Sequence, residues 1–172
     1  MISHELKPYL LSVCQILNSH EVDYLIVGGA AVSHYGFNRP SGIGQYRSEL
    51  NVDLDFWYNP TIENFEKILN ALDELSVDIS DLRKIVFDAK RTFLKIPHEN
   101  FHMDFLPQMV GLKSFRESKK NADMLTLDGV SLLVMSLDDL ILNKRSVNRA
   151  IDHSDIKELD KLRKQKPKGP RL

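Results

Sequence analysis

The sequence predicts an α+β protein in which helices pack against a mixed β-sheet. Short apolar or alternating segments, typical of strands, are interspersed with segments whose apolar residues recur at helical spacing. One pair of strand-like segments is separated only by Asp128-Gly129, a dipeptide that favours a tight antiparallel hairpin. The length of 172 residues suits one folding unit. We therefore expect a single domain over residues 1–160 and a basic, flexible tail over residues 161–172.

Composition argues against several classes of protein. The chain is 42% hydrophobic and 27% charged, as in ordinary soluble globular proteins, and no window holds the ~18 uncharged apolar residues of a membrane span. Cys14 is the single cysteine, so neither an internal disulfide nor a multi-cysteine zinc site can form. The N-terminal segment lacks the basic start and apolar run of a secretory signal. We expect a cytoplasmic protein with no membrane partner.

The net charge of −1 is unevenly distributed along the chain. Residues 161–172 contain six basic side chains and no acidic one. Such a tail can contact the phosphates of RNA. A solvated chain end has the same composition, and Pro167, Gly169 and Pro170 favour this simpler interpretation.

Apolar spacing and capping residues predict the elements of the first half of the chain. In order, we expect a helix over residues 5–19, a buried strand over 24–27, a short helix over 30–35, a long loop over 37–50, a strand over 52–57 and an amphipathic helix capped by Thr61. A loop of this length in a compact domain commonly serves function.

The second half is predicted by the same signals, although residues 78–90 show no clear pattern. In order, we expect strands over residues 92–96 and 101–106, a helix over 111–121, a hairpin of strands over 124–127 and 130–134, a helix capped by Ser136 that ends near 147, and a last helix that Asp152 or Ser154 opens.

Two aspartates alternate with apolar residues in the strand over residues 52–57. Residues two apart in a strand project from the same face, so Asp53 and Asp55 share one face while Leu54 and Phe56 point toward the core. Two carboxylates so placed can share hard cations such as magnesium. A solvated outer face of the sheet would give the same pattern, although aspartate is disfavoured in strands and the two charges repel.

The strand over residues 101–106 repeats this alternation. It places His102 and Asp104 on one face and apolar side chains on the other. If this strand lies beside the first, Asp104 completes a cluster of three carboxylates with Asp53 and Asp55. Such a cluster is unfavourable without cations, and with two magnesium ions it becomes a template for phosphoryl chemistry.

A pair of glycines, Gly28-Gly29, separates a buried strand from a short helix. Glycines allow a sharp turn and a close approach of backbone N–H groups to a ligand. The start of the following helix supplies unpaired donors suited to phosphate. Alone, such a pair is most commonly a simple turn.

The order and spacing of these features resemble the nucleotidyltransferase superfamily, which includes DNA polymerase beta, kanamycin nucleotidyltransferase and the minimal nucleotidyltransferases. The resemblance is carried by VGGAAVSHYG at residues 27–36, NVDLDF at 51–56 and HMDF at 102–105. The segment SLDDLILNK at 136–144, followed by Arg149, Asp152 and Asp155, is similar to small bacterial members, some of them abortive-infection-type toxins. The glycine segment resembles the Gly-Gly-Ala branch.

This resemblance implies a magnesium-dependent nucleotidyltransferase with two metal ions. Asp53 and Asp55 would bind both ions, and Asp104 would bind the catalytic one and position or deprotonate the attacking hydroxyl. The hydroxyl of an acceptor would attack the α-phosphorus of a nucleoside triphosphate such as ATP and expel pyrophosphate.

The resemblance also implies a set of triphosphate contacts. Gly28, Gly29 and Ser33 are candidates, as is Lys144, although a lysine on a helix surface is commonly only solvated. The loop over 37–50 is longer than the related family pattern, and either Arg39 or Arg47 could fill the role of the family's arginine.

The acceptor and the partners are not determined by the sequence. RNA, and transfer RNA in particular, would suit a toxin-like protein with a basic tail, and an antitoxin protein is then a candidate partner. Two alternatives remain: a non-catalytic relative that binds a nucleotide or a partner protein, and a two-metal phosphodiesterase or nuclease. The three expected carboxylates count against the first, and the glycine pair counts against the second.

Overall fold

A computed structural model describes residues 7–36, 52–98 and 101–165 of the chain. The predicted loop over 37–50, with both candidate arginines Arg39 and Arg47, lies outside these residues, as do residues 166–172. Residues 161–165, which we assigned to a flexible tail, form the end of the last helix.

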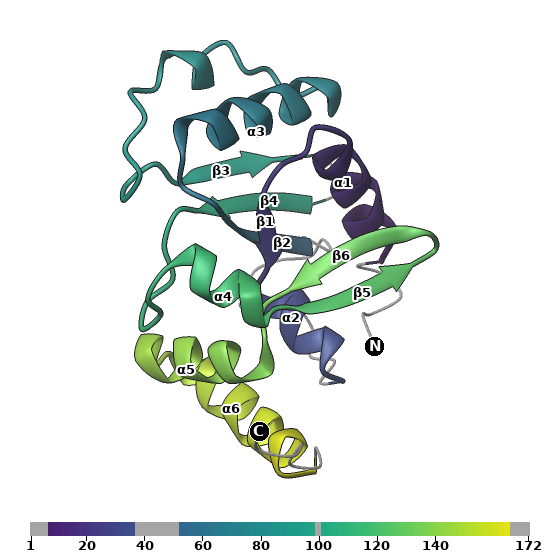
Figure 1. The fold of residues 1–172 in the computed structure, drawn as a ribbon, viewed down its shortest axis with the longest axis vertical. Helices are drawn as coiled ribbons and strands as arrows, with labels where there is room; N and C mark the ends of the chain where they lie inside the picture. Colours follow the sequence, from purple (N-terminus) through teal and green to yellow (C-terminus); the bar gives the residue numbers. More distant parts are fainter. Residues whose placement is uncertain (1–6, 37–51, 99–100, 166–172) are drawn as a thin grey trace.

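The described strands form one six-stranded mixed sheet in the order β3-β4-β2-β1-β6-β5 (Figure 1). The strands are β1 (Tyr24–Ile26), β2 (Val52–Tyr58), β3 (Leu94–Pro97), β4 (Phe101–Leu106), β5 (Asp123–Leu127) and β6 (Val130–Val134). Strand β1 pairs antiparallel with β2 and parallel with β6, while β2 pairs parallel with β4. The predicted α+β class with a mixed sheet is confirmed.

Helices flank the sheet along the length of the molecule, with α3 at one end and α5 and α6 together at the other (Figure 1). The described helices are α1 (Lys7–Ser19), α2 (Gly28–His34), α3 (Ile62–Glu74), α4 (Phe115–Asn121), α5 (Leu137–Val147) and α6 (Ala150–Gln165), with a 3₁₀ turn over Leu82–Lys84. No helix in the described ranges is both long and apolar enough to span a lipid bilayer.

Hydroxyl side chains fix the starts of three helices. Thr61, Ser114 and Ser136 each accept a hydrogen bond from the backbone N–H three residues further on, at 3.2–3.3 Å. These bonds satisfy donors that the first turn of a helix leaves unpaired. Two of these caps, Thr61 and Ser136, were expected from the sequence.

The hairpin of β5 and β6 forms at the dipeptide that predicted it. Asp128 and Gly129 both have positive φ, at 48° and 82°, as a tight turn between twisted antiparallel strands requires. The pairing of Leu127 with Val130 closes the hairpin.

The core lies on the face of the sheet that carries the apolar residues of β2 and β4. Leu54, Phe56 and Phe105 are fully buried, and the rings of Phe56 and Phe105 stack with centroids 5.2 Å apart. Tyr24 meets Phe56 edge to face at 5.5 Å. Burial of this face fixes which side chains of β2 and β4 point the other way.

Three helix starts differ from our expectations. Helix α2 begins at Gly28, so the glycine pair forms its first turn instead of preceding it. Helix α4 begins at Phe115 and not at residue 111, because Gly111 has φ +81° and lies against Ser146, and Ser114 is the cap. Helix α6 begins at Ala150, so Asp152 lies in its first turn and does not open it.

Candidate active site

Strand pairing brings the three predicted aspartates to one face of the sheet. The parallel register of β2 and β4 places Asp55 opposite Asp104 and Asp53 opposite His102. The intervening residues Leu54 and Met103 are fully buried on the other face. Since alternate residues of a strand share a face, the three carboxylates project together, away from the core.

The electrostatics of Asp55 reflect this crowding. Burial, the charge of Asp104 and the charge of Asp53 raise the pKa of Asp55 to about 6, although a hydrogen bond from the backbone N–H of Gly29 and the charge of Arg149 oppose the rise. Like charges at short range disfavour ionisation unless a cation compensates them. The cluster therefore has excess negative charge that a cation would relieve.

Asp104 occupies a related environment. Burial raises its pKa, as does Asp53, while Lys95 and His102 act in the opposite direction. Its Oδ1 atom is buried and has no hydrogen-bond partner in the described part of the chain. A buried polar atom without a partner is costly and is commonly explained by a bound ion or water.

The glycine pair lies directly against Asp55. Gly28 has φ +60°, and a Cβ atom added there would stand 1.9 Å from Oδ2 of Asp55. The backbone N–H of Val27 also donates to the carbonyl of Asp55 at 3.0 Å. A residue without a side chain is therefore required at position 28, both by the backbone conformation and by the carboxylate beside it. Ser33, five residues on, is buried in the last turn of α2.

Lys144 does not lie on a helix surface. Its side chain is 3% exposed, and its Nζ atom forms ion pairs with Asp152 at 3.2 Å and with Asp155 at 2.7 Å, both carboxylates being fully buried. This cluster joins α5 to α6, and its two carboxylates engage the Lys144 ammonium group. The phosphate contact suggested by the sequence is therefore replaced by a structural role.

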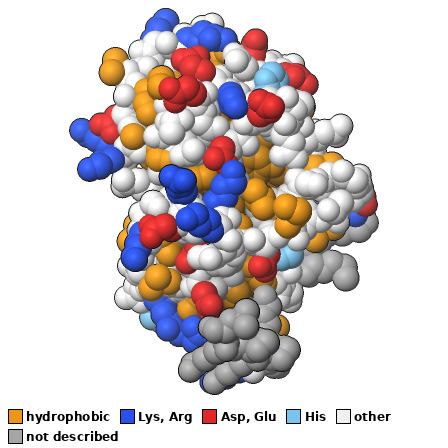
Figure 2. Space-filling view, viewed as in Figure 1, with side chains coloured by type: hydrophobic (Ala, Val, Ile, Leu, Met, Phe, Trp, Pro, Cys, Tyr) orange, Lys and Arg blue, Asp and Glu red, His pale blue; other side chains and the backbone are white. Residues whose placement is uncertain are grey.

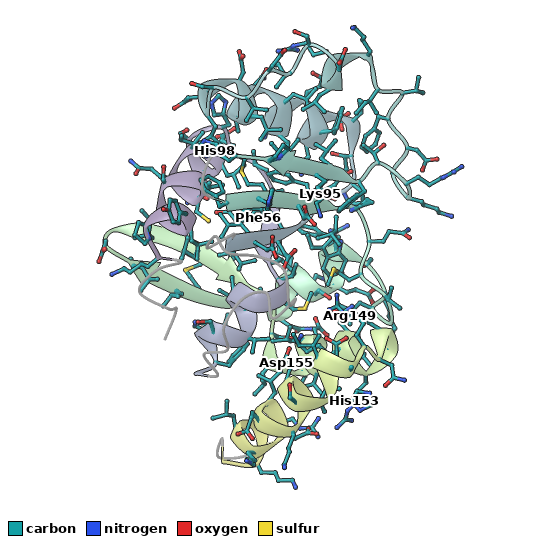
Figure 3. All side chains as sticks on the ribbon, turned by 180° about the vertical axis from the view of Figure 1, so that it is seen from behind. Phe56, Lys95, His98, Arg149, His153 and Asp155 are labelled. Carbon is teal, nitrogen blue, oxygen red and sulfur yellow. The ribbon has the colours of Figure 1, made fainter. Side chains whose placement is uncertain are left out.

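Arg149 was quoted in the sequence resemblance without a role, and the structure places it near the site. Its guanidinium donates to Asp152 through Nε at 2.9 Å and through Nη2 at 3.2 Å, while 64% of the side chain remains exposed. The Asp152 hydrogen bonds raise the pKa of Arg149, and Asp55 adds to this effect. Figure 3 shows Arg149 where α5 and α6 approach the sheet.

Lys95 is a further member of this face that the sequence did not identify, whereas His102 lies on it as the alternation of its strand predicted. Lys95 is exposed on β3 and pairs in register with Asp104, and Figure 3 shows it on the strand beyond β4. His102 lies two residues before Asp104, and its Nδ1 atom is buried without a hydrogen-bond partner in the described ranges. The alternation of residues 94–97 could have placed Lys95, had the pairing of β3 with β4 been known.

The donors of this face suit magnesium in kind, because that cation prefers carboxylate oxygens. No group of three or more His, Cys, Asp or Glu side chains within the described residues stands at metal-binding spacing. The unsatisfied Oδ1 atom of Asp104 and the mutual repulsion of the aspartates nevertheless fit a cation. Asp53, Asp55 and Asp104 are the residues that would hold it.

The fold of the described residues is similar to that of solved nucleotidyltransferase structures. Lincosamide antibiotic adenylyltransferase LnuA, in its lincomycin-bound form, is similar over 94% of this chain and 98% of its own, with 15% identity and a TM-score of 0.57. A putative nucleotidyltransferase from Thermotoga maritima is similar over 95% and 94%, with 13% identity and a TM-score of 0.53. An antigenic nucleotidyltransferase-like protein from Paracoccidioides brasiliensis is similar over 94% and 78%, with 16% identity and a TM-score of 0.52.

At these identities the likeness shows the fold, and the predicted nucleotidyltransferase fold is confirmed. No protein-family model matches the sequence, and no curated protein matches it either.

The contact between Gly28 and Asp55 predicts that Gly28→Ala destabilises the protein through two effects. A positive φ costs an alanine about 1–2 kcal/mol, and the new Cβ would also displace the Asp55 carboxylate. Gly129→Ala is the matched control, because Gly129 has φ +82° and no atom within 4 Å of an added Cβ. Urea unfolding should show a larger loss for Gly28→Ala, and equal losses would contradict the contact.

The buried cluster of Lys144 predicts a large effect of Lys144→Met. Removing one partner of a buried ion pair costs about 3–5 kcal/mol, because the remaining charges are left uncompensated. Lys161→Met serves as the control, since Lys161 pairs with Glu158 at the surface and such pairs contribute roughly 0–1 kcal/mol. Chemical denaturation measures both. A loss below about 1 kcal/mol for Lys144→Met would contradict the structural role.

Proposed function

We propose that this protein is a magnesium-dependent nucleotidyltransferase that moves a nucleoside monophosphate from a nucleoside triphosphate to an acceptor hydroxyl and releases pyrophosphate. The observation that carries the proposal is the position of Asp55, which lies beside Asp104 in the register of β2 and β4 and directly against Gly28. The nucleotidyltransferase fold of the solved structures to which the chain is similar supports it.

The site has a direction across the sheet. Lys95, Asp104 and Asp55 follow one another in register over β3, β4 and β2, and Gly28 lies against the far side of Asp55. Backbone N–H groups at the start of α2 suit phosphate oxygens. We infer that the nucleotide phosphates lie on the Gly28 side of Asp55 and that the acceptor approaches on the Lys95 side of Asp104.

Each carboxylate has a task in this arrangement. Asp53, Asp55 and Asp104 would hold magnesium, and Asp104 would also orient the acceptor hydroxyl and accept its proton. Magnesium, when bound, neutralises charge on the attacking and leaving oxygens. The hydroxyl oxygen forms a bond to the α-phosphorus as the bond to pyrophosphate breaks, so the proton passes to Asp104 and the negative charge leaves with pyrophosphate.

Two acceptor classes are consistent with the molecule. A group of Lys and Arg side chains lies on the face shown in Figure 2. The last turn of α4 carries Lys119 and Lys120, and together with the basic residues 161–172 these lysines favour RNA. LnuA, by its name, adenylylates a lincosamide antibiotic, which favours a small hydroxylated compound. A toxin acting on transfer RNA, with an antitoxin partner, is one form of the first class.

Label transfer tests the proposed function. The purified protein would be incubated with magnesium, each α-labelled nucleoside triphosphate in turn, and either total cellular RNA or a small-molecule extract. We expect one acceptor to gain label with release of pyrophosphate, and a chelator to stop the reaction. Nucleotide binding without any labelled product would favour the non-catalytic alternative, and failure to bind any nucleotide would overturn the proposal.

The acidic cluster predicts the effect of isosteric substitutions on label transfer. Asp53→Asn, Asp55→Asn and Asp104→Asn should each reduce the rate by roughly 100-fold or more, as expected when one preorganised electrostatic group is lost. Asp73→Asn is the control, because Asp73 is an exposed aspartate on α3, outside the acidic cluster. Full activity of Asp53→Asn or Asp55→Asn would contradict the metal assignment.

A further inference from the structure

We propose that Arg149 binds the polyphosphate of the nucleotide and that Asp152 positions it for this purpose. The inference rests on the proposed function and adds a phosphate-binding residue to it. Arg149 lies between α5 and α6, outside every motif that the sequence analysis assigned to the site.

The backbone turn directs Arg149 toward the sheet. Helix α5 ends at Val147, and Asn148 adopts a left-handed conformation with φ 57° and ψ 39°, which reverses the chain before α6 begins at Ala150. Asparagine tolerates this conformation better than most residues. Arg149 is thus held in a two-residue turn whose geometry both helices fix, and Figure 3 shows it where α5 and α6 approach the sheet.

Asp152 holds the guanidinium of Arg149 through hydrogen bonds. It accepts hydrogen bonds from Nε and Nη2 of Arg149 and from the Arg149 backbone N–H at 3.0 Å. Asp152 is itself fully buried and is held by the buried ammonium of Lys144. Burial would raise the pKa of Asp152, but the Arg149 hydrogen bonds and Lys144 lower it to about 2, so this carboxylate stays ionised near neutral pH.

The anchored guanidinium keeps donors for a ligand. An arginine has five N–H donors in a planar fork, and Asp152 engages Nε and one donor of Nη2. The side chain is 64% exposed, so its remaining donors can reach a phosphate in the paired geometry that arginine favours. Holding the side chain in advance reduces the entropy that ligand binding would cost.

The charge of Arg149 favours a phosphate ligand close to Asp55. Arg149 and Asp55 act on each other electrostatically, while the hydrogen bonds of Arg149 go to Asp152. A cation fixed near Asp55 but bonded to a separate, buried carboxylate can attract an anion to the edge of the acidic face. The triphosphate of a nucleotide is the anion that the proposed function supplies.

Nucleotide binding measured by calorimetry tests the inference without reliance on turnover. With magnesium present, wild type, Arg149→Ala and Arg149→Lys would be titrated with ATP, with AMP and with inorganic tripolyphosphate, and the corresponding triphosphate replaces ATP if label transfer selects another base. We expect Arg149→Ala to weaken ATP and tripolyphosphate binding about 10- to 100-fold, as for lost hydrogen bonds to a charged group, with little change for AMP. Arg149→Lys keeps the charge without the fork and should be intermediate.

Arg145→Ala is a matched control on the same pair of helices. Arg145 lies on α5 and pairs with Asp160 of α6 at 2.7 Å, so its loss removes the same charge and a similar ion pair away from the aspartates. Its ATP and AMP affinities should equal those of wild type. Wild-type ATP affinity in folded Arg149→Ala and Arg149→Lys would overturn the inference and leave the proposed function intact. If wild type binds no nucleotide at all, both fail.

The positioning role of Asp152 has its own readout. If Asp152 acts through Arg149, the single substitution Asp152→Asn should lower the ratio of ATP affinity to AMP affinity. Added to Arg149→Ala, the same substitution should not lower this ratio further. Thermal unfolding of all variants separates this effect from loss of fold. Equal effects of Asp152→Asn in the two backgrounds would show that Asp152 is only structural.

Discussion

The parallel pairing of β2 with β4 sets Asp55 beside Asp104, and the candidate site depends on this single register. A shift of one residue would turn every side chain of a strand to the opposite face, burying the aspartates and exposing Phe56 and Phe105. The register is therefore held by the aromatic and aliphatic core on the other face, where Phe56 stacks on Phe105. The apolar residues of these strands stabilise the fold and, in doing so, force the carboxylates together.

The crowding of the carboxylates causes electrostatic repulsion, which the surrounding residues reduce but do not remove. The Gly29 N–H and Arg149 act against the raised pKa of Asp55, and Lys95 and His102 act against that of Asp104. Each compensating group approaches from a different element, so the acidic face is framed by α2, β3 and the turn before α6. The carboxylates of this face repel one another, and groups that favour negative charge surround them. Such a face suits a ligand that carries both cations and anions, such as a metal-bound nucleotide.

Local patterns in the sequence predicted much of the fold because their causes are local. Alternation in β2 and β4, the caps Thr61 and Ser136, and the turn at Asp128-Gly129 depend on residues a few positions apart. The start of α2 was misplaced because the turn at Gly28 is set by contact with Asp55, 27 residues away in sequence. A contact between residues so far apart in sequence cannot be predicted from a short segment. The sequence analysis nevertheless assigned both residues to the same candidate site.

Lys144 and Arg149 show the same limit more sharply, because a basic residue can neutralise a buried charge or bind a ligand, and only its surroundings decide which. In α5 and α6, Lys144 lies inward between Asp152 and Asp155, while Arg149 is bonded to Asp152 and remains exposed. The buried lysine satisfies the carboxylates, and Asp152 in turn holds the arginine. Lys144, which the sequence suggested as a phosphate ligand, thus pairs with the buried carboxylate of Asp152. The same carboxylate holds the exposed guanidinium of Arg149.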